Sequence, residues 1–354
     1  MDEKIENSFV NKDFPKKLGY IPSLDGLRAI AVIMVMLMHA HFQLGKNGSM
    51  GVDMFFALSG FLITTLLLEE YRSTNRISVR AFYVRRAFRL FPALYFMLSV
   101  ILLYALLFTI GTTQGIILKE ILASSIYMYN ICWMWDFKQI LLGHTWSLGV
   151  EEQFYFVWPL LIIIFLRFFS ANKLQIGLLF FIPIVFYIKF TKQFPIVNSL
   201  FYESLFIGCF FALLRWNGKL PNRIPNVITV LVFLLLVIVG IFPISSFLNN
   251  NTRFIVGVLT MIVILGLVEE PNSKVGKLLS NDILVFIGKI SYALYLWHLP
   301  VFRWFFWHST LPPIISFIAK FLVTFILAVL SLKLIETKLI KVGQSLSKRL
   351  ITII

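Results

Sequence analysis

Long apolar runs recur along this chain from residue 27 to residue 335, and they constrain its fold more than any other feature. A membrane-crossing helix needs about 20 mainly apolar residues. The stretches that meet this requirement are 24–44, 51–69, 90–110, 145–166, 174–190, 198–215, 225–243, 252–269, 284–306 and 312–335. The sequence therefore predicts an all-α, polytopic membrane helical bundle of about ten transmembrane helices, folded as a single domain over residues 1–354.

The composition excludes several other classes of protein. Of the 354 residues, 59% are hydrophobic and 14% are charged, whereas a soluble domain carries about 25% charged residues. A soluble enzyme and a disordered chain are excluded on this basis. The two cysteines, Cys132 and Cys209, are far apart in sequence and do not indicate a secreted disulfide scaffold. Residues 1–20 are polar and charged, so we predict no cleavable signal peptide.

The net charge of +15 indicates membrane topology rather than a nucleic-acid partner, because the basic residues lie mostly between the apolar runs. The stretch 116–135 is ambiguous. If it does not cross, 24 Lys and Arg residues lie inside, seven lie outside, and Lys320 lies within a helix. If it crosses, the split becomes 16 to 15. We therefore expect 116–135 to lie along the outer surface or to re-enter it.

This topology places the chain in the cell (inner or cytoplasmic) membrane as a multi-pass protein, in contact with membrane lipid. Both ends are then cytoplasmic, with an N-terminal segment at 1–20 and a tail at 336–354. We expect no fused soluble domain. Polar side chains at membrane depth cost about 2.5–3.5 kcal/mol when charged, so each is a candidate functional residue.

His39 is the first such residue. It lies near the outer end of the first apolar run, about 7–8 Å below the end at Leu44, from the helical rise per residue. Imidazole titrates near neutral pH, so His39 is a candidate general base or nucleophile. The alternative is a neutral histidine hydrogen-bonded to a neighbouring helix.

Two adjacent carboxylates, Glu151 and Glu152, lie near the outer start of the run 145–166. Acidic residues are favoured at a helix N-terminus, which accounts for Glu152 but poorly for Glu151. The predicted topology places Glu151 at a depth similar to that of His39. A carboxylate beside an imidazole orients the base and raises its basicity. We therefore predict that Glu151 orients His39.

Arg85 and Arg89 lead into the third apolar run from the cytoplasmic side and share a helix face at i,i+4 spacing. Two guanidinium groups on one face suit a phosphate or pyrophosphate. The alternative is that they are ordinary positive-inside arginines that contact lipid headgroups. Arg72, Arg76 and Arg80 are assigned only that role.

Other polar positions are weaker candidates. Asp53 lies at the outer edge of the second run, and Tyr295 and His298 lie in the run 284–306 as candidates for lining an acceptor site. Glu203 is a buried acid without an assigned partner. His39 and His41 form the only close histidine pair and lack the companion ligands of a metal site, so no metal is expected. No GxGxxG, P-loop or GxSxG motif occurs.

Together these segments resemble the large bacterial membrane acyltransferase family (acyltransferase type three), which includes O-antigen, nodulation-factor and peptidoglycan O-acetyltransferases. The segments that carry the resemblance are 23–31 (SLDGLRAIA) with His39, 51–61 (GVDMFFALSGF), 82–92 (FYVRRAFRLFP), 145–155 (TWSLGVEEQFY) and 291–298 (SYALYLWH). They follow the family's order and extend over nearly the whole chain.

The resemblance implies an acyl-CoA donor, most commonly acetyl-CoA, on the cytoplasmic side and transfer to a hydroxyl of a cell-surface or lipid-linked glycan. It assigns His39 as the essential histidine, and Arg85 and Arg89 match the family's RxxxR pair for the donor. An extracytoplasmic partner enzyme that completes the transfer stays open, because the chain resembles the stand-alone members. Further substrate-binding or structural candidates are Asp25, Arg28, Asp53, Ser147, Glu152, Gln153, Tyr155, Tyr295 and His298.

The expected activity is thus O-acyl transfer, with His39 either as the base or as an acyl relay. The alternative is a transporter or flippase for a lipid-linked sugar or acyl group. The absence of visible inverted-repeat symmetry counts against a transporter. Consumption of acyl-CoA discriminates between the two.

Overall fold

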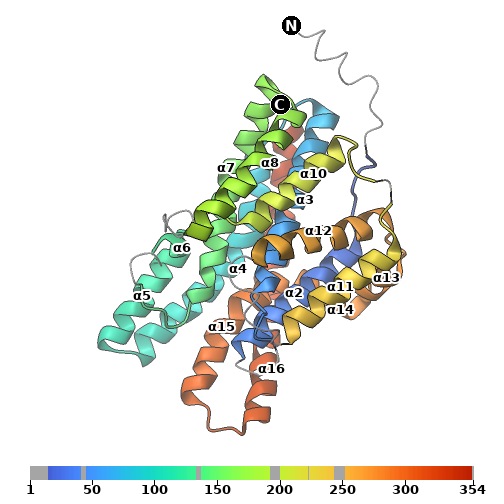
Figure 1. Ribbon diagram of the computed structural model, residues 1–354. Helices are drawn as coiled ribbons and strands as arrows, with labels where there is room; N and C mark the ends of the chain where they lie inside the picture. The colour runs from blue at the N-terminus through green and yellow to red at the C-terminus, as the bar shows by residue number, and fades with distance from the viewer. Residues whose placement is uncertain are drawn as a thin grey trace.

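The computed structural model describes residues 15–40, 45–132, 137–191, 200–221, 223–242 and 252–352, and every regular element in these ranges is helical (Figure 1). The helices are α2 (Pro22–His39), α3 (Met50–Thr74), α4 (Val79–Phe108), α5 (Gly111–Ser125), α6 (Tyr129–Cys132), η2 (Gly143–Thr145), α7 (Trp146–Phe168), α8 (Ala171–Thr191), α10 (Glu203–Trp216), α11 (Asn226–Ile241), α12 (Thr252–Glu269), α13 (Lys274–Leu279), α14 (Asp282–Lys289), α15 (Ser291–His308), α16 (Pro313–Ser331), the π-helix η4 (Leu332–Glu336) and α17 (Thr337–Thr352). The prediction of an all-α membrane bundle is confirmed.

Within the described ranges, six helical segments are long and apolar enough to cross a membrane. They are Pro22–His39, Met50–Thr74, Val79–Phe108, Gly143–Phe168, Ala171–Ile188 and Pro313–Leu350. α11 is apolar but has 16 residues, and α10 has 14. Since those two helices are shorter than a full span, the count of ten and the cytoplasmic location of both ends stay predictions.

The predicted span 284–306 is not one straight helix. α14 and α15 meet at Ile290 with a bend of 68°, and counting this pair as one broken span raises the total to seven. Asn281 caps α14 by accepting a hydrogen bond from the amide of Ile283. The predicted span 284–306 therefore corresponds to a broken pair of helices, and the short α14 packs separately against α2.

The ambiguous stretch 116–135 also contains a break. α5 ends at Ser125, and Tyr127 has a positive φ of 55° before α6 begins at Tyr129. Residues 133–136 lie outside the described ranges. The described part is therefore not one continuous spanning helix, in agreement with the distribution of basic residues.

Glu120 of α5 anchors the chain that leads into α7. The carboxylate is fully buried and accepts hydrogen bonds from the amides of Ile140, Leu141 and Leu142 at 2.9–3.2 Å. The Tyr129 hydroxyl adds a fourth bond at 2.8 Å. A buried carboxylate with four donors satisfies backbone groups that would otherwise lose hydrogen bonds in the interior. It fixes the segment that precedes η2.

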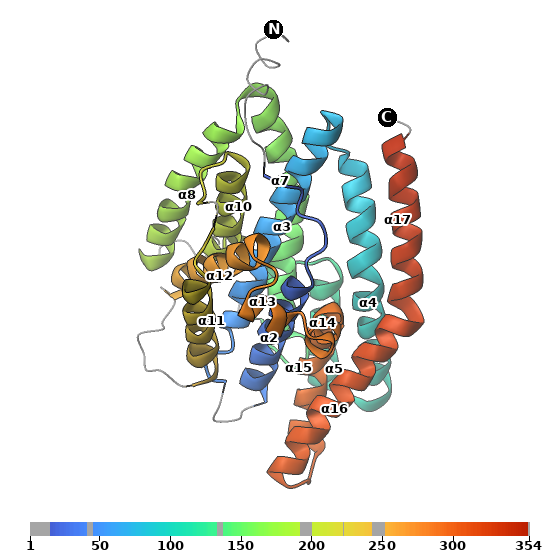
Figure 2. The same cartoon turned by 90° about the vertical axis from the view of Figure 1, so that its right-hand side faces the viewer.

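Helices α3 and α10 cross at small residues. A Cβ at Gly60 would lie 2.0 Å from the carbonyl oxygen of Leu205, and one at Gly208 would lie 2.1 Å from that of Ala57. Only glycine permits backbones to approach this closely, which is a recurrent mode of helix packing in membranes. On the opposite side of the bundle, α17 lies along α4 (Figure 2).

We predict that Gly208→Ala destabilises the fold by about 1–3 kcal/mol, because its methyl group overpacks the α3–α10 crossing. Thermal unfolding of the detergent-purified protein measures the effect. Gly177→Ala is the matched control, since a Cβ at Gly177 on α8 meets nothing within 4 Å. Equal unfolding temperatures for the two variants would contradict the packing described here.

Candidate active site

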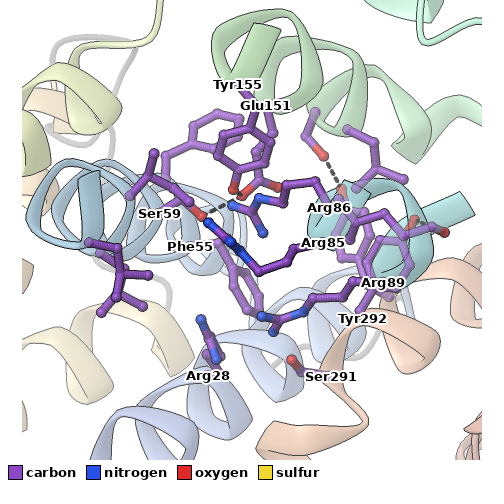
Figure 3. Close-up of a pocket in the computed structure, with 18 of the residues that line it drawn as sticks. Arg28, Phe55, Ser59, Arg85, Arg86, Arg89, Glu151, Tyr155, Ser291 and Tyr292 are labelled. Atoms are coloured by element: carbon purple, nitrogen blue, oxygen red, sulfur yellow. Dashed lines mark hydrogen bonds between the residues drawn. The ribbon is translucent and has the colours of Figure 1, made fainter. Parts of the chain in front are cut away.

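A cavity of about 280 Å³ lies among helices α2, α3, α4, α7 and α15 (Figure 3). One wall consists of apolar side chains, chiefly from α3, and the remaining lining is polar. The polar lining residues are Arg28, Ser59, Glu70, Arg85, Arg86, Arg89, Ser147, Glu151, Tyr155, Ser291, Tyr292 and Tyr295. The cavity therefore collects residues from each of the five segments that the sequence analysis singled out.

Four arginines line this cavity, against two carboxylates among the lining residues. Arg85 pairs with Glu70, with Nη2 and Oε2 3.3 Å apart, and donates a hydrogen bond of 2.8 Å to Ser347 on α17. The Arg85 side chain is 36% exposed, so it lies at the mouth of the cavity. Arg28 pairs with Asp25 at 3.0 Å, and Asp25 also accepts a hydrogen bond from Tyr20.

Arg86 and Arg89 continue the basic lining along α4. The guanidinium carbon of Arg86 is 3.7 Å from the centre of the Tyr155 ring, a cation–π contact, while its Nε is buried without a hydrogen-bond partner. Arg89 is exposed, and it lies close enough to Arg28 and Arg86 to be repelled by both. All four arginines point towards one space (Figure 3). A surplus of positive charge around a cavity, with one buried donor atom unsatisfied, suits an anionic ligand.

Glu151 lines this cavity, and its hydrogen bonds within the described residues are made with two hydroxyl groups. Its Oε1 accepts short hydrogen bonds from the hydroxyls of Ser59 and Tyr155. Tyr155 follows Glu151 by one helical turn, so the two side chains share a face of α7. The predicted pairing of Glu151 with His39 stays a prediction, because these two hydrogen bonds give Glu151 other partners but do not test the pair.

The structure places an imidazole beside His39 instead. Nδ1 of His39 lies 3.0 Å from the carbonyl oxygen of Val35 and 3.2 Å from Nε2 of His298, and the two rings are 5.0 Å apart. A third histidine, His144, lies 5.1 Å from the His298 ring. His144 and His298 are buried, and His39 is partly exposed. We call His39, His144 and His298 the histidine cluster.

Ser147 and Tyr295 connect the cavity to the histidine cluster. Their hydroxyl oxygens are 2.6 Å apart, and both residues line the cavity. The Tyr295 hydroxyl also donates to the carbonyl oxygen of His144 at 2.9 Å, and its ring lies 5.3 Å from that of His298. The ring of Tyr295 therefore separates the cavity from the histidine cluster and contacts both.

The remaining candidates lie outside the cavity lining. Gln153 exchanges hydrogen bonds of 2.9 and 3.1 Å with Asn130 and so joins α7 to α6. Glu152 does not line the cavity. Asp53 accepts a 3.0 Å hydrogen bond from Ser204, which follows Glu203 at the start of α10. Asp53 and Gln153 thus join neighbouring helices, and neither Glu152 nor Glu203 lines the cavity.

Sequence reasoning gave no role to Arg86 or His144. Arg86 directly follows Arg85, but the i,i+4 argument selected one helix face and passed over it. His144 directly precedes the segment 145–155, where an apolar run begins, so a search within the runs does not find it. In the described part of the chain, no group of three or more His, Cys, Asp or Glu residues is arranged to hold a metal ion.

Residues 21–333 match the model of the acyltransferase domain family, so the match covers nearly all the helices described above. The chain therefore belongs to this family of membrane acyltransferases, as the resemblance in its motifs implies. Two curated proteins that are similar to this chain are named as O-acetyltransferases.

The chain is 32% identical to the peptidoglycan O-acetyltransferase OatA of Listeria monocytogenes, over 92% of this chain and 56% of that protein. It is 33% identical to the O-acetyltransferase OatA of Staphylococcus aureus, over 92% of this chain and 58% of that protein. The chain thus spans a little over half the length of these relatives. No solved structure gives a significant match.

We predict that Glu151→Ala destabilises the protein by about 1–3 kcal/mol, because the buried hydroxyls of Ser59 and Tyr155 lose their acceptor. Glu151→Gln keeps an acceptor oxygen and should recover most of that stability. Thermal unfolding in detergent compares the two variants. If the alanine variant unfolds at the temperature of the wild type, the hydroxyl–carboxylate cluster does not support the cavity wall.

Proposed function

We propose that this chain is a membrane-embedded O-acyltransferase that moves an acetyl group from cytoplasmic acetyl-CoA to a hydroxyl of a cell-surface or lipid-linked glycan in the cell membrane. The observation that carries the proposal is a cavity lined by four arginines whose inner end lies beside the histidine cluster. Membership of the acyltransferase domain family and the names of the relatives support it.

The arginines suit the charged part of the donor. Coenzyme A carries a diphosphate and a further phosphate at one end, and guanidinium groups bind phosphates through paired, charge-assisted hydrogen bonds. Arg85 lies at the mouth, and Arg86 and Arg89 line the same cavity from α4. In our proposal these three residues bind the phosphates, while Arg28 approaches from α2. The free Nε of Arg86 gains a partner when the donor binds.

Helix α2 sets the distance between the donor phosphates and the reacting group. His39 follows Arg28 by eleven residues on α2, which is about 16 Å along the helix axis from the rise per residue. The pantetheine arm of the donor is long and largely uncharged, and the apolar α3 wall suits it. The acetyl thioester would then lie near Ser147 and Tyr295, beside the histidine cluster.

The chemistry requires one proton transfer and one bond exchange. Nε2 of His39 takes the proton of the acceptor hydroxyl while the hydroxyl oxygen attacks the carbonyl carbon of the thioester. The new C–O ester bond forms, the C–S bond breaks, and the proton passes to the departing thiolate. A positioned base contributes about 10²–10⁴-fold to such a step. The thioester is already activated, so no further reagent is needed.

The acceptor is proposed from the relatives. One of them is named as a peptidoglycan O-acetyltransferase, and an envelope glycan fits a base placed at the outer end of α2. The relatives extend well beyond the region that matches this chain.

We predict that His39→Ala lowers the transfer of label from radioactive acetyl-CoA into glycan by about 10²–10⁴-fold in inverted membrane vesicles, because the base is lost. The expression level and the unfolding temperature should stay close to those of the wild type. Transfer at the wild-type rate would remove His39 from the mechanism. If folded wild-type protein consumes no short acyl-CoA, the transporter hypothesis replaces the enzyme.

We predict that Arg86→Ala raises the KM for acetyl-CoA about ten- to hundredfold, since charge-assisted hydrogen bonds contribute about 1.5–3 kcal/mol. Initial rates at varied acetyl-CoA concentration measure this effect. Arg76→Ala is the matched control, because Arg76 is an exposed arginine in the segment between α3 and α4. Equal KM values for the two variants would mean that the arginines set topology only.

A further inference from the structure

We infer that His298 is a positioning residue for His39: it accepts the hydrogen on Nδ1 of His39 and thereby leaves Nε2 as the basic nitrogen. The inference rests on the proposed function only in assuming that His39 acts on the acceptor hydroxyl. It assigns to His298 a role different from the acceptor-site lining expected from the sequence.

The hydrogen-bond partners define the tautomer of His39. A carbonyl oxygen only accepts hydrogen bonds, so the 3.0 Å contact from Nδ1 to the carbonyl of Val35 requires a hydrogen on Nδ1. Nε2 of His298 also lies on this side of the ring, 3.2 Å from Nδ1 of His39, and can share the same hydrogen. In a neutral imidazole the other nitrogen then carries no hydrogen and has the lone pair. Nε2 of His39 is therefore the nitrogen that can accept a proton.

His298 has the complementary tautomer. Its Nδ1 faces the carbonyl oxygen of Tyr295, one turn earlier on α15, and so donates a hydrogen bond. This leaves Nε2 of His298 with a lone pair directed at His39. Two backbone carbonyls, on α2 and on α15, thus give the two rings matching donor and acceptor nitrogens without any charged group.

The surroundings hold His298 in this orientation. Its side chain is fully buried, with the rings of His144, Tyr295 and Phe302 at 5.1, 5.3 and 5.9 Å. Nε2 of His144 in turn faces the carbonyl oxygen of Leu296 at 3.1 Å. Complete burial disfavours a charge on His298. A proton taken from the acceptor therefore stays on His39, which is partly exposed.

The arrangement has the logic of a catalytic triad with a neutral third member. In a serine hydrolase, a carboxylate holds the catalytic imidazole in the correct tautomer and orientation. Here a buried imidazole provides the acceptor, and Glu151 stays with the cavity hydroxyls. A neutral acceptor orients the base without stabilising the imidazolium as strongly. We therefore expect the loss of His298 to cost less than the loss of His39.

The test compares two polar replacements that differ in reach. Glutamine at position 298 places an amide oxygen near the position of Nε2, where it accepts the His39 hydrogen. Asparagine replaces Nδ1 and keeps the bond to the Tyr295 carbonyl, but does not reach His39. We expect His298→Asn to lower kcat for glycan acetylation about ten- to hundredfold with an unchanged KM for acetyl-CoA. His298→Gln should keep kcat within about fivefold of the wild type.

A matched control lies on the same helix. His308 is exposed, and its Nδ1 faces the carbonyl oxygen of Trp304 at 3.0 Å. His308→Asn should leave kcat and KM unchanged. A double variant separates positioning from a structural role: in the His39→Ala background, His298→Asn should cause no further loss, because His298 acts through His39.

Three results would overturn the inference while leaving the proposed function in place. They are equal kcat values for the Asn and Gln variants, a further loss in the double variant, or an Asn variant as active as the wild type while His39→Ala is inactive. A different result concerns the proposed function itself. If His39→Ala acetylates glycan at the wild-type rate, His39 is not the base, and the assignment of His298 falls with it.

Discussion

A buried guanidinium must find an anionic or hydrogen-bonding partner, and this requirement organises the molecule. Arg85 and Arg28 have carboxylate partners, Glu70 and Asp25. Arg86 has an aromatic ring on one face and a buried Nε without a partner, and Arg89 is close to two like charges. In an apolar bundle such an arrangement is costly. In the proposed function, the phosphates of the donor compensate for that cost, which gives a reason for the arginines to line one cavity.

In the proposed function, helix α2 links the basic cavity to the group that acts on the acceptor hydroxyl. It carries Arg28 at the basic cavity and His39 in the histidine cluster, so a single rigid element sets the distance between them. Its neighbours hold it closely: a Cβ at Gly26 would lie 1.9 Å from the carbonyl of Leu279, and one at Gly288 would lie 1.8 Å from that of Asp25. The broken α14–α15 pair permits this packing and also presents Tyr295 and His298 to the site.

The sequence predicted the membrane bundle, the family and most of the basic cavity, because apolar length and the spacing of arginines on one helix are local properties. The sequence did not predict side-chain contacts that depend on how a helix is rotated about its own axis. The hydrogen bonds of Glu151 with Ser59 and Tyr155 were not predicted, since depth in the membrane does not specify the direction of a side chain. His298 could be located but not paired, since a break at Ile290 turns its helix by 68°. The short α14 before the bend packs against α2, and a contact between two helices far apart in sequence is not encoded in either segment alone.

The central claim is that the basic cavity and the histidine cluster form one site along α2. A cryo-EM structure with a non-hydrolysable acetyl-CoA analogue tests it most directly. We predict phosphate density within hydrogen-bonding distance of Arg85, Arg86 and Arg89, and the acyl end beside Tyr295 on the side of His39. Phosphates bound elsewhere, or an acyl end directed away from the histidine cluster, would contradict the account.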